Sequence, residues 1–417
     1  MRIRVVVSVV LLMGAATACT GGGTSASPSG QVTSTTRPLR FGAEPLWSAQ
    51  TKGAPRSAAR FTLHGDSVVM FNGPKTGKAY ELYVRDAATG RARWSARMWR
   101  PLPGGHGDRW NGAGSDDAAP VVVDRGGGWG VLVVTTRRSA ARQKPYGLAL
   151  LDGEDGHVVW RRKLVGADRT PAHGRYLSPG RLLTDGAHAV VMLRPSLGGT
   201  GREFRLAAVD VRTGARLWTR DRVTLDAVVA GSVVGVELPD APILNDTGTG
   251  PVTVLDAATG RTRWSRSVGA RGRMTAVAGG LLLLRERQGG TSAAPVLDLV
   301  KGTELGRMPA QIGACVDDRT TLIACEVSSP ESRLYTIGTG DRKVRVSAHA
   351  PPKGMGLTFV RDGRIFYSGL FLPGRELDRA GTPLAGRLPE DHLLALSGRY
   401  AVVGAPAVQS YRVYGVG

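Results

Sequence analysis

The sequence has little cysteine, few histidines and no long amphipathic helical pattern. Its three cysteines, at positions 19, 315 and 325 of 417 residues, are too few for a disulfide-rich scaffold or a Cys-rich metal site. The seven histidines are scattered singly, and no nucleophile is paired with a base in a recognisable spacing. These absences argue against hydrolytic and metal-dependent enzymes, and we expect no catalytic residue, no metal and no cofactor.

Acidic residues are outnumbered by basic ones. The 55 Lys and Arg residues against 34 Asp and Glu residues give a formal net charge of +21. Most of the basic residues are Arg and they are spread along the whole chain, without the aromatic and basic pattern of RNA-binding modules, so no nucleic-acid partner is predicted. Two explanations of the charge stay open: biased codon usage at high genomic G+C, or attraction to anionic lipid headgroups or wall polymers.

The N-terminus carries the longest apolar run, and this run is too short to span a bilayer. Arg2 and Arg4 precede the apolar stretch from Val5 to Met13, which small residues and Cys19 follow. The segment Ala16-Thr17-Ala18-Cys19 resembles the lipobox of a bacterial lipoprotein signal, although Ala16 stands where that family prefers Leu. We expect residues 1–19 to be a signal peptide and Cys19 to be lipidated, which predicts anchoring on the outer face of the bacterial cytoplasmic membrane. An ordinary secretory signal is the alternative.

The next segment, residues 20–40, is rich in Gly, Ser and Thr and has no apolar pattern. Such a composition cannot bury enough surface to offset the entropy of ordering, so it predicts a flexible tether. The folded domain is then residues 41–417.

The rest of the chain is organised by a repeat, whose clearest copy is VTVLDAATGRTRWSRSV from Val252 to Val268. An apolar run ends in Asp, a polar turn ends in Gly, and Trp follows eight residues after the Asp. Each copy predicts a β-hairpin in which Gly supplies a positive φ and Asp accepts bonds from turn amides. The four strong copies have the pairs Asp86 and Trp94, Asp152 and Trp160, Asp210 and Trp218, and Asp256 and Trp264; weaker copies lie at Asp298, Gly338 and Asp378.

Both ends of the folded domain hold incomplete units. PLWSAQ, at Pro45–Gln50, matches only the second half of the repeat, whereas Gly398–Val403 and Ser410–Tyr414 supply early strands without a last one. The N-terminal strand therefore completes the C-terminal unit and closes a ring, which removes exposed sheet edges. Counting this shared unit, we predict an all-β fold, an eight-bladed β-propeller with four antiparallel strands per blade; seven blades remain possible.

The repeated pattern D-x-x-x-G-x-x-x-W resembles the blade motif of PQQ-repeat, or quinoprotein alcohol dehydrogenase-like, β-propellers. The resemblance implies that each Trp packs between neighbouring blades and that each turn caps an outer hairpin. It assigns structural roles to Trp47, Trp94, Trp160, Trp218 and Trp264.

The resemblance also raises an enzymatic alternative. Quinoprotein dehydrogenases hold PQQ in the central funnel with a calcium ion, an Asp base and, commonly, adjacent cysteines. No two cysteines are adjacent here and no calcium-binding set is assignable, so a PQQ-dependent dehydrogenase is only the alternative. Cys315 and Cys325 instead flank a polar turn, where a hairpin would bring them opposite each other in a disulfide; free buried thiols are the other possibility.

The long connections predict where partners bind. Connections between second and third strands, and between blades, emerge on one face, and variable loops on a rigid scaffold often carry function. The candidate binding residues lie between the first two blades and in the following interblade connection: His106, Asp108, Arg109, Trp110, Asn111 and His173. We predict a monomeric, non-catalytic platform for binding or assembly of protein or anionic envelope-polymer partners; sensing of a small molecule in the funnel is a further alternative.

Overall fold

A computed structural model describes most of the chain from residue 37 onward. The described residues are 37–50, 60–72, 81–97, 108–110, 119–137, 146–164, 177–195, 204–239, 250–269, 272–288, 291–327, 332–368, 374–384, 392–405 and 410–417. Residues 36–417 form one compact unit, which is the unit described below.

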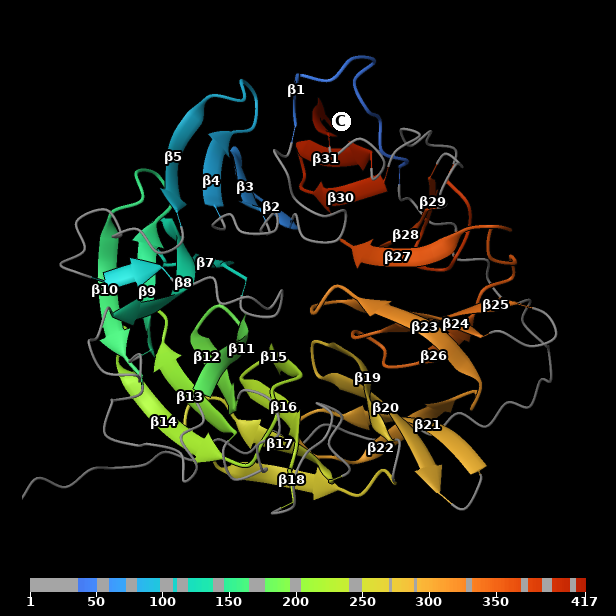
Figure 1. The fold of residues 1–417 in the computed structure, drawn as a ribbon. Helices are drawn as coiled ribbons and strands as arrows, with labels where there is room; N and C mark the ends of the chain where they lie inside the picture. Colours follow the sequence, from blue (N-terminus) through green and yellow to red (C-terminus); the bar gives the residue numbers. More distant parts are fainter. Residues whose placement is uncertain are drawn as a thin grey trace, which may run out of the picture. The chain divides into compact units, whose positions relative to one another are not determined.

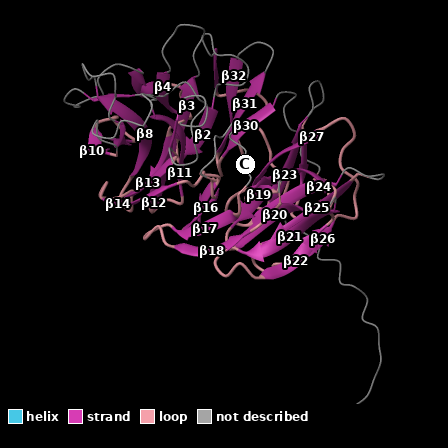
Figure 2. Ribbon diagram, turned by 60° about the horizontal axis from the view of Figure 1, so that its bottom comes forward, coloured by secondary structure: helices cyan, strands magenta, loops and turns pink. Residues whose placement is uncertain are grey.

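This unit is an eight-bladed β-propeller, as the repeat predicted. Eight antiparallel sheets follow one another around a ring, and the described residues contain strands but no helix (Figures 1 and 2). Within this part of the chain there is accordingly no apolar helix long enough to cross a membrane.

The blades are numbered in chain order. Blade 1 comprises β2 (Arg60–His64), β3 (Ser67–Asn72), β4 (Glu81–Asp86) and β5 (Ala92–Arg97); blade 2 comprises β6 (Asp108–Trp110), β7 (Val121–Asp124), β8 (Trp129–Arg137), β9 (Tyr146–Asp152) and β10 (Val158–Lys163). Blade 3 comprises β11 (Leu177–Thr184), β12 (His188–Pro195), β13 (Arg205–Asp210) and β14 (Arg216–Asp221); blade 4 comprises β15 (Ala227–Val229), β16 (Ser232–Val236), β17 (Val252–Asp256) and β18 (Thr262–Arg266).

The second half of the ring continues the same order. Blade 5 comprises β19 (Arg273–Ala278), β20 (Leu281–Gln288), β21 (Thr291–Asp298) and β22 (Glu304–Met308); blade 6 comprises β23 (Ile312–Asp317), β24 (Leu322–Val327), β25 (Arg333–Gly338) and β26 (Val344–Val346). Blade 7 comprises β27 (Gly356–Arg361), β28 (Arg364–Ser368) and β29 (Arg375–Leu377); blade 8 comprises β30 (His392–Leu396), β31 (Tyr400–Ala405), β32 (Ser410–Gly415) and β1 (Trp47–Gln50).

The N-terminal strand closes the ring, which confirms the prediction from the two incomplete units. β1 pairs antiparallel with β32, with Trp47 opposite Val413 and Gln50 opposite Ser410. In blades 1 and 8, for example, the first strand lies nearest the middle of the ring and the last lies towards the rim (Figure 1). The rim strand of blade 8 therefore comes from the opposite end of the chain to its three partners.

Two blades depart from four regular strands. In blade 7 the described residues give three strands, and a single bridge between Leu377 and Pro383 stands where the fourth would begin. In blade 2 the inner position is divided, because β7 pairs with the first half of β8 and β6 with the second half. The nine-residue β8 is longer than either inner strand, so two short segments share its edge.

The core lies between the blades. The middle strands are nearly continuous apolar runs because a neighbouring blade covers each of their faces. In β16 all five residues from Ser232 to Val236 are buried, and buried residues of blades 1 and 2 such as Val84 and Val131 share one apolar cluster. Each junction is thus a sheet-on-sheet interface, and the propeller is held together blade by blade.

A Trp at the rim of one blade contacts the turn of the next blade. The Trp94 indole of blade 1 donates to the Gly153 carbonyl of blade 2 at 2.9 Å. A Cβ at Gly156 in the same turn would lie 2.7 Å from the Trp94 ring, and Gly156 has φ of +77°. The turn therefore needs Gly both for its backbone conformation and for the close approach of the ring. We call this contact the Trp staple.

The Trp staple recurs at five consecutive junctions, from blade 8 to blade 5. In every case the indole donates to the carbonyl of the residue that follows the motif Asp, and the ring covers the turn Gly. The pairs are Trp47 with Ala87 and Gly90, Trp94 with Gly153 and Gly156, Trp160 with Val211 and Gly214, Trp218 with Ala257 and Gly260, and Trp264 with Leu299 and Gly302.

The junction between blades 5 and 6 has an ion pair in the position that the Trp staple occupies elsewhere. Gly306 occupies the position of the Trp on β22, and the position of the turn Gly in blade 6 is Arg342, with φ of +57°. Because no ring covers this turn, a side chain fits there, and the Arg342 guanidinium reaches Asp298 of blade 5 at 2.7 Å. An ion pair thus takes the place of the staple.

Cys315 and Cys325 form a disulfide between β23 and β24 of blade 6, where the two residues are directly opposite each other. The bridge closes a loop with a sequence separation of 10 residues. Cys325 is fully buried and belongs to the apolar cluster shared with blade 5.

Reducing this disulfide should lower the free energy of unfolding by about 2–3 kcal/mol, because a closed loop of this length restricts the unfolded chain. Thermal unfolding followed by circular dichroism, with and without dithiothreitol, measures the change. The Cys315→Ala, Cys325→Ala double variant is the control, since the reductant should not shift its midpoint. An unchanged midpoint for the reduced wild-type chain would contradict the expectation.

Candidate functional site

The two faces of the ring differ in their connections. The first and second strands of each blade, and the third and fourth, are joined by short turns on one side, which we call the turn face. The second-to-third and the interblade connections lie on the opposite side, which we call the loop face. Most of the loop-face connections lie outside the described residues, whereas the turn face is described nearly throughout.

Of the predicted binding residues, the structure describes only Asp108–Trp110, whose backbone pairs with the loop-face end of β8. Asp108–Trp110 form strand β6, not a loop, because their backbone pairs with Arg137, Thr136 and Thr135 of β8. The free edge of β8 requires hydrogen-bond partners, and this segment provides them. His106, Asn111 and His173 lie outside the described residues, as do the side chains of Asp108, Arg109 and Trp110.

On the turn face, carboxylates hold the turns together. In blade 4 the Asp256 carboxylate accepts bonds from the Thr259 amide at 2.9 Å and from the Arg263 guanidinium at 2.7 Å. The hydrogen bond from Arg263 lowers the pKa of Asp256 to about 2. In blade 1 the hydroxyl of Thr89, followed by Arg93, lowers the pKa of Asp86 in the same way. The motif Asp is therefore charged and paired, which suits a structural role.

Acid should weaken the blade 4 turn. Because the pKa of Asp256 is lower in the folded chain, its stabilising contribution is present above the unfolded pKa near 3.8 and is lost as the pH falls towards 2. Allowing for partial exposure, Asp256→Asn should cost about 1 kcal/mol at pH 7 and nearly nothing at pH 2. Urea unfolding at both values measures this. A cost that is equal at the two pH values would contradict it.

Two further carboxylates, those of Asp226 and Asp317, are half-buried near the inner strands. Asp226, at the start of blade 4, lies 3.4 Å from the guanidinium of Arg181 in blade 3, and burial raises the pKa of Asp226. Asp317 in blade 6 accepts a bond from the Val277 amide of blade 5 at 3.2 Å, and burial raises its pKa also. Each carboxylate thus connects two neighbouring blades, through Arg181 for Asp226 and through the Val277 amide for Asp317, which indicates a structural role.

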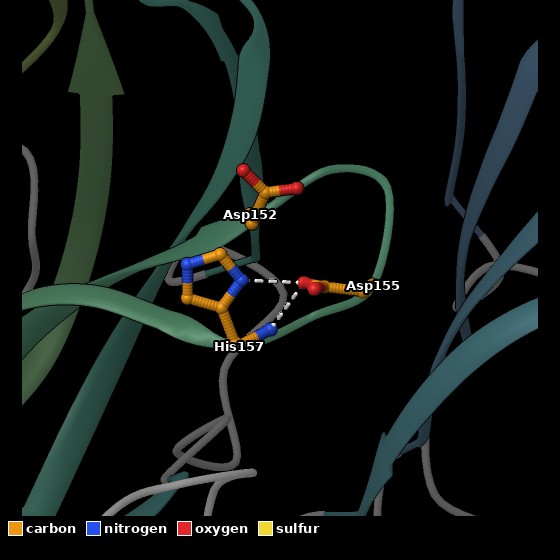
Figure 3. Close-up of side chains that lie close together, drawn as sticks. All are labelled: Asp152, Asp155 and His157. Carbon is orange, nitrogen blue, oxygen red and sulfur yellow. Dashed lines mark hydrogen bonds and ion pairs between the residues drawn. The ribbon is translucent and has the colours of Figure 1, made fainter.

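One group in the described residues has the composition of a metal site. The ligand atoms of Asp152, Asp155 and His157 in the blade 2 turn lie within 4.8 Å of one another. In Figure 3 the contacts run between Asp155 and His157. The Asp152 carboxylate accepts bonds from the Glu154 amide at 2.8 Å and from Arg125 at 2.7 Å. Because Arg125 already supplies a positive charge, this geometry is that of a capped turn and is poorly suited to a cation.

The described residues also reveal contacts that the repeat pattern did not disclose. Arg162 and Arg220, each two residues after a blade Trp, donate to the carbonyls of Gly214 and Gly260 in the next blade. The sequence offered a signal for these, since an Arg recurs at that position in blades 2, 3 and 4. Trp and Arg thus hold the same turn from adjacent positions of one strand.

The chain that enters the propeller is fixed at the junction of blades 7 and 8. The Leu39 amide donates to the fully buried carboxylate of Glu376 at 3.0 Å, and Arg364 binds both that carboxylate and the Arg37 carbonyl. Arg40 exchanges two backbone hydrogen bonds with Gly417. We call residues 37–42 the entry segment. The sequence did not reveal it, because its partners are more than 300 residues away.

The comparisons with known proteins agree with this architecture. A family model described as "Outer membrane protein assembly factor BamB" matches residues 78–303, which is more than half of the chain. This chain belongs to that family. The BamB-like match begins before blade 1 is complete and ends at the turn of blade 5, so it spans the blades that carry the strong repeats.

Solved structures with the same fold are distant in sequence. The designed Ika8 protein is 16% identical, with a TM-score of 0.50 over 88% of this chain and 98% of that one, and the Dos1 propeller is 10% identical, with a TM-score of 0.50 over 89% and 95%. BamB from Moraxella catarrhalis is 13% identical, with a TM-score of 0.49 over 90% and 97%. No curated protein matches the chain. These similarities concern the fold alone.

Two features of the described residues differ from the PQQ arrangement that the resemblance implies. The disulfide of Cys315 and Cys325 joins two strands of blade 6, whereas the quinoprotein arrangement uses adjacent cysteines. The one described group with metal-binding composition lies in an outer hairpin turn of blade 2 and is paired with Arg125.

Proposed function

We propose that this chain is a lipid-anchored propeller outside the cytoplasm that acts as a non-catalytic platform for binding or assembly of protein partners, with anionic envelope polymers as the second partner class. Membership of the BamB-like family carries the proposal, because that family is described as an assembly factor. The segment up to Cys19 supports the anchor, since it has the charged, apolar and small-residue parts of a lipoprotein signal.

The architecture suits a platform. Blade-to-blade contacts, including the Trp staples and the Arg bonds, make a closed scaffold whose loop-face connections differ in length and composition. The Asp256 and Asp226 carboxylates, whose pKa values are shifted, are paired with Arg263 and Arg181. Binding through loops on a rigid ring is therefore the function that this geometry supports best.

Photo-crosslinking in membranes tests the proposal. A crosslinking amino acid placed in the loop-face connections, at Lys75 or Arg142, should give discrete adducts with an envelope protein or polymer, whereas the turn-face positions Ala88 and Ala258 should give none with that partner. Fractionation of the Cys19→Ser variant tests the anchor, since that variant should leave the membrane. Adducts absent from every loop-face position would contradict the platform, and dye-linked dehydrogenase activity with added PQQ and calcium would contradict the non-catalytic role.

A further inference from the structure

We infer that the turn face is the side of the propeller that faces the membrane, and that the loop face is presented away from it. The inference rests on the proposed lipid anchor at Cys19. It follows from where the chain enters the folded unit, because an anchored segment restrains the propeller at its point of attachment.

Strand direction places this point of attachment. β32 is a third strand of its blade, so it runs from the loop face towards the turn face and ends there at Gly415. The entry segment pairs with the residues that follow: Gly42 donates to the Gly415 carbonyl at 3.0 Å, and Arg40 bonds with Gly417 in both directions. The chain therefore enters on the turn face of blade 8.

A neighbouring blade gives the same position independently. Arg364 is the first residue of β28, a second strand, and hence lies at the turn-face end of blade 7. Its guanidinium donates to the carbonyl of Arg37 at 2.8 Å. The start of the entry segment is thus held at the turn face from two blades.

The entry segment is packed against blades 7 and 8, so it does not act as part of the flexible tether. Leu39 and Phe41 pack against an apolar cluster that includes Phe366 of blade 7 and Ala401 of blade 8. The Leu39 amide also satisfies the buried Glu376 carboxylate, which would be costly to leave with one partner fewer. Detaching the segment would expose these groups, so the proposed tether extends from the anchor only as far as residue 36.

The tether is short in comparison with the propeller. A chain with the length of residues 20–36 spans about 23 Å on average as a random coil, and about 60 Å when fully extended. The nine residues of β8 alone measure about 30 Å between the two faces. To bring the loop face to the bilayer, the tether would have to run the height of a blade in a nearly extended state, which costs conformational entropy.

The turn face is also electrostatically suited to lie near anionic headgroups. Five of its carboxylates form ion pairs with guanidinium groups, and these pairs recur around the ring. They join Asp86 with Arg93, Asp152 with Arg125, Asp256 with Arg263, Asp298 with Arg342, and Asp341 with Arg345. This face therefore does not repel an anionic bilayer as unpaired carboxylates would.

Fluorescence quenching on vesicles tests the orientation. Single cysteines are introduced into the full-length lipidated chain at two turn-face positions, Ala88→Cys and Ala258→Cys, and at two loop-face positions, Gln50→Cys and Pro239→Cys; all four side chains are exposed. The labelled proteins are placed in vesicles of anionic lipid that carry a quencher on the headgroup. We expect the turn-face labels to be quenched at least about twofold more than the loop-face labels.

Two controls separate this inference from the proposed anchor. The Cys19→Ser chain should not bind the vesicles; if the wild-type chain also fails to bind, the anchor itself is wrong and the orientation falls with it. Inserting a 40-residue Gly/Ser segment after Gly30 should reduce the difference between the two faces. If the anchored wild-type chain shows equal quenching at both faces, or more at Gln50 and Pro239, the orientation is wrong while the anchor stands.

Discussion

A chain that begins at residue 51 should not fold into a closed ring. This truncation removes the entry segment, β1 and Trp47, and so leaves β32 with an unpaired edge and the blade 1 turn without its staple. Loss of the Trp47 side chain alone should cost about 3–5 kcal/mol, and the lost strand pairing adds to it. We expect aggregation, or a thermal transition that is broad and much lower than that of the intact domain.

A chain that begins at residue 36 is the matched control. It keeps every residue that the structure describes, so its thermal midpoint and its circular dichroism should equal those of the full-length protein without signal peptide. Size-exclusion chromatography and thermal unfolding compare the three chains. If the chain beginning at residue 51 unfolds cooperatively at the wild-type temperature, closure by the N-terminal strand does not stabilise the propeller.

Trp94 and Gly156 should show strong energetic coupling. Trp94→Ala should cost about 3–5 kcal/mol, because it removes a large buried ring. Gly156→Ala alone should cost about 1–2 kcal/mol for the left-handed backbone and about 1–3 kcal/mol more for the contact with the Trp94 ring. In the Trp94→Ala background the ring is absent, so Gly156→Ala should cost only about 1–2 kcal/mol, for the left-handed backbone conformation.

A double-mutant cycle by urea unfolding measures this coupling. Gly126→Ala in the same blade is the matched control, since Gly126 has φ of +76° and an added Cβ would meet nothing within 4 Å. It should cost about 1–2 kcal/mol in either background. Additive costs for Trp94 and Gly156 would mean that the Gly is needed for its backbone conformation alone.

The sequence revealed the parts of the fold that repeat. The spacing of Asp, Gly and Trp gave the hairpins of blades 1 to 4, and the half-repeat around Trp47 gave the closure of the ring, because a strand without its partner must find one elsewhere. Counting the two incomplete ends as one unit predicted eight blades, with seven left open, and the structure has eight. Local rules are sufficient for these hairpins, since the Asp, the Gly and the Trp of each strong copy are separated by the same number of residues.

The sequence was least informative where a contact has no counterpart in other blades. Arg342 stands at the position of a turn Gly, and it fits there because blade 5 has Gly306 where other blades have the Trp. The hydrogen bond from Leu39 to Glu376 joins two segments that are distant in the sequence. The placement of Asp108–Trp110 in a strand depends on the length of β8. For the candidate binding residues, the polar composition of a long connection predicted a binding face. No spacing pattern in the sequence predicted which of these side chains lie close to one another.

The junction with Gly306 and Arg342 shows that the Trp staple determines which residues a turn of this propeller can accept. Where a Trp covers a turn, the turn position is restricted to Gly, and a change at either site is penalised until the other changes. Where the Trp is absent, that restriction is lifted, and the turns of blades 6 and 7 already depart from the motif. The five stapled turns, in blades 1 to 5, are therefore the ones at which a single substitution is most restricted. At the turn of blade 6, in contrast, exchanging Arg342 for another side chain meets no ring.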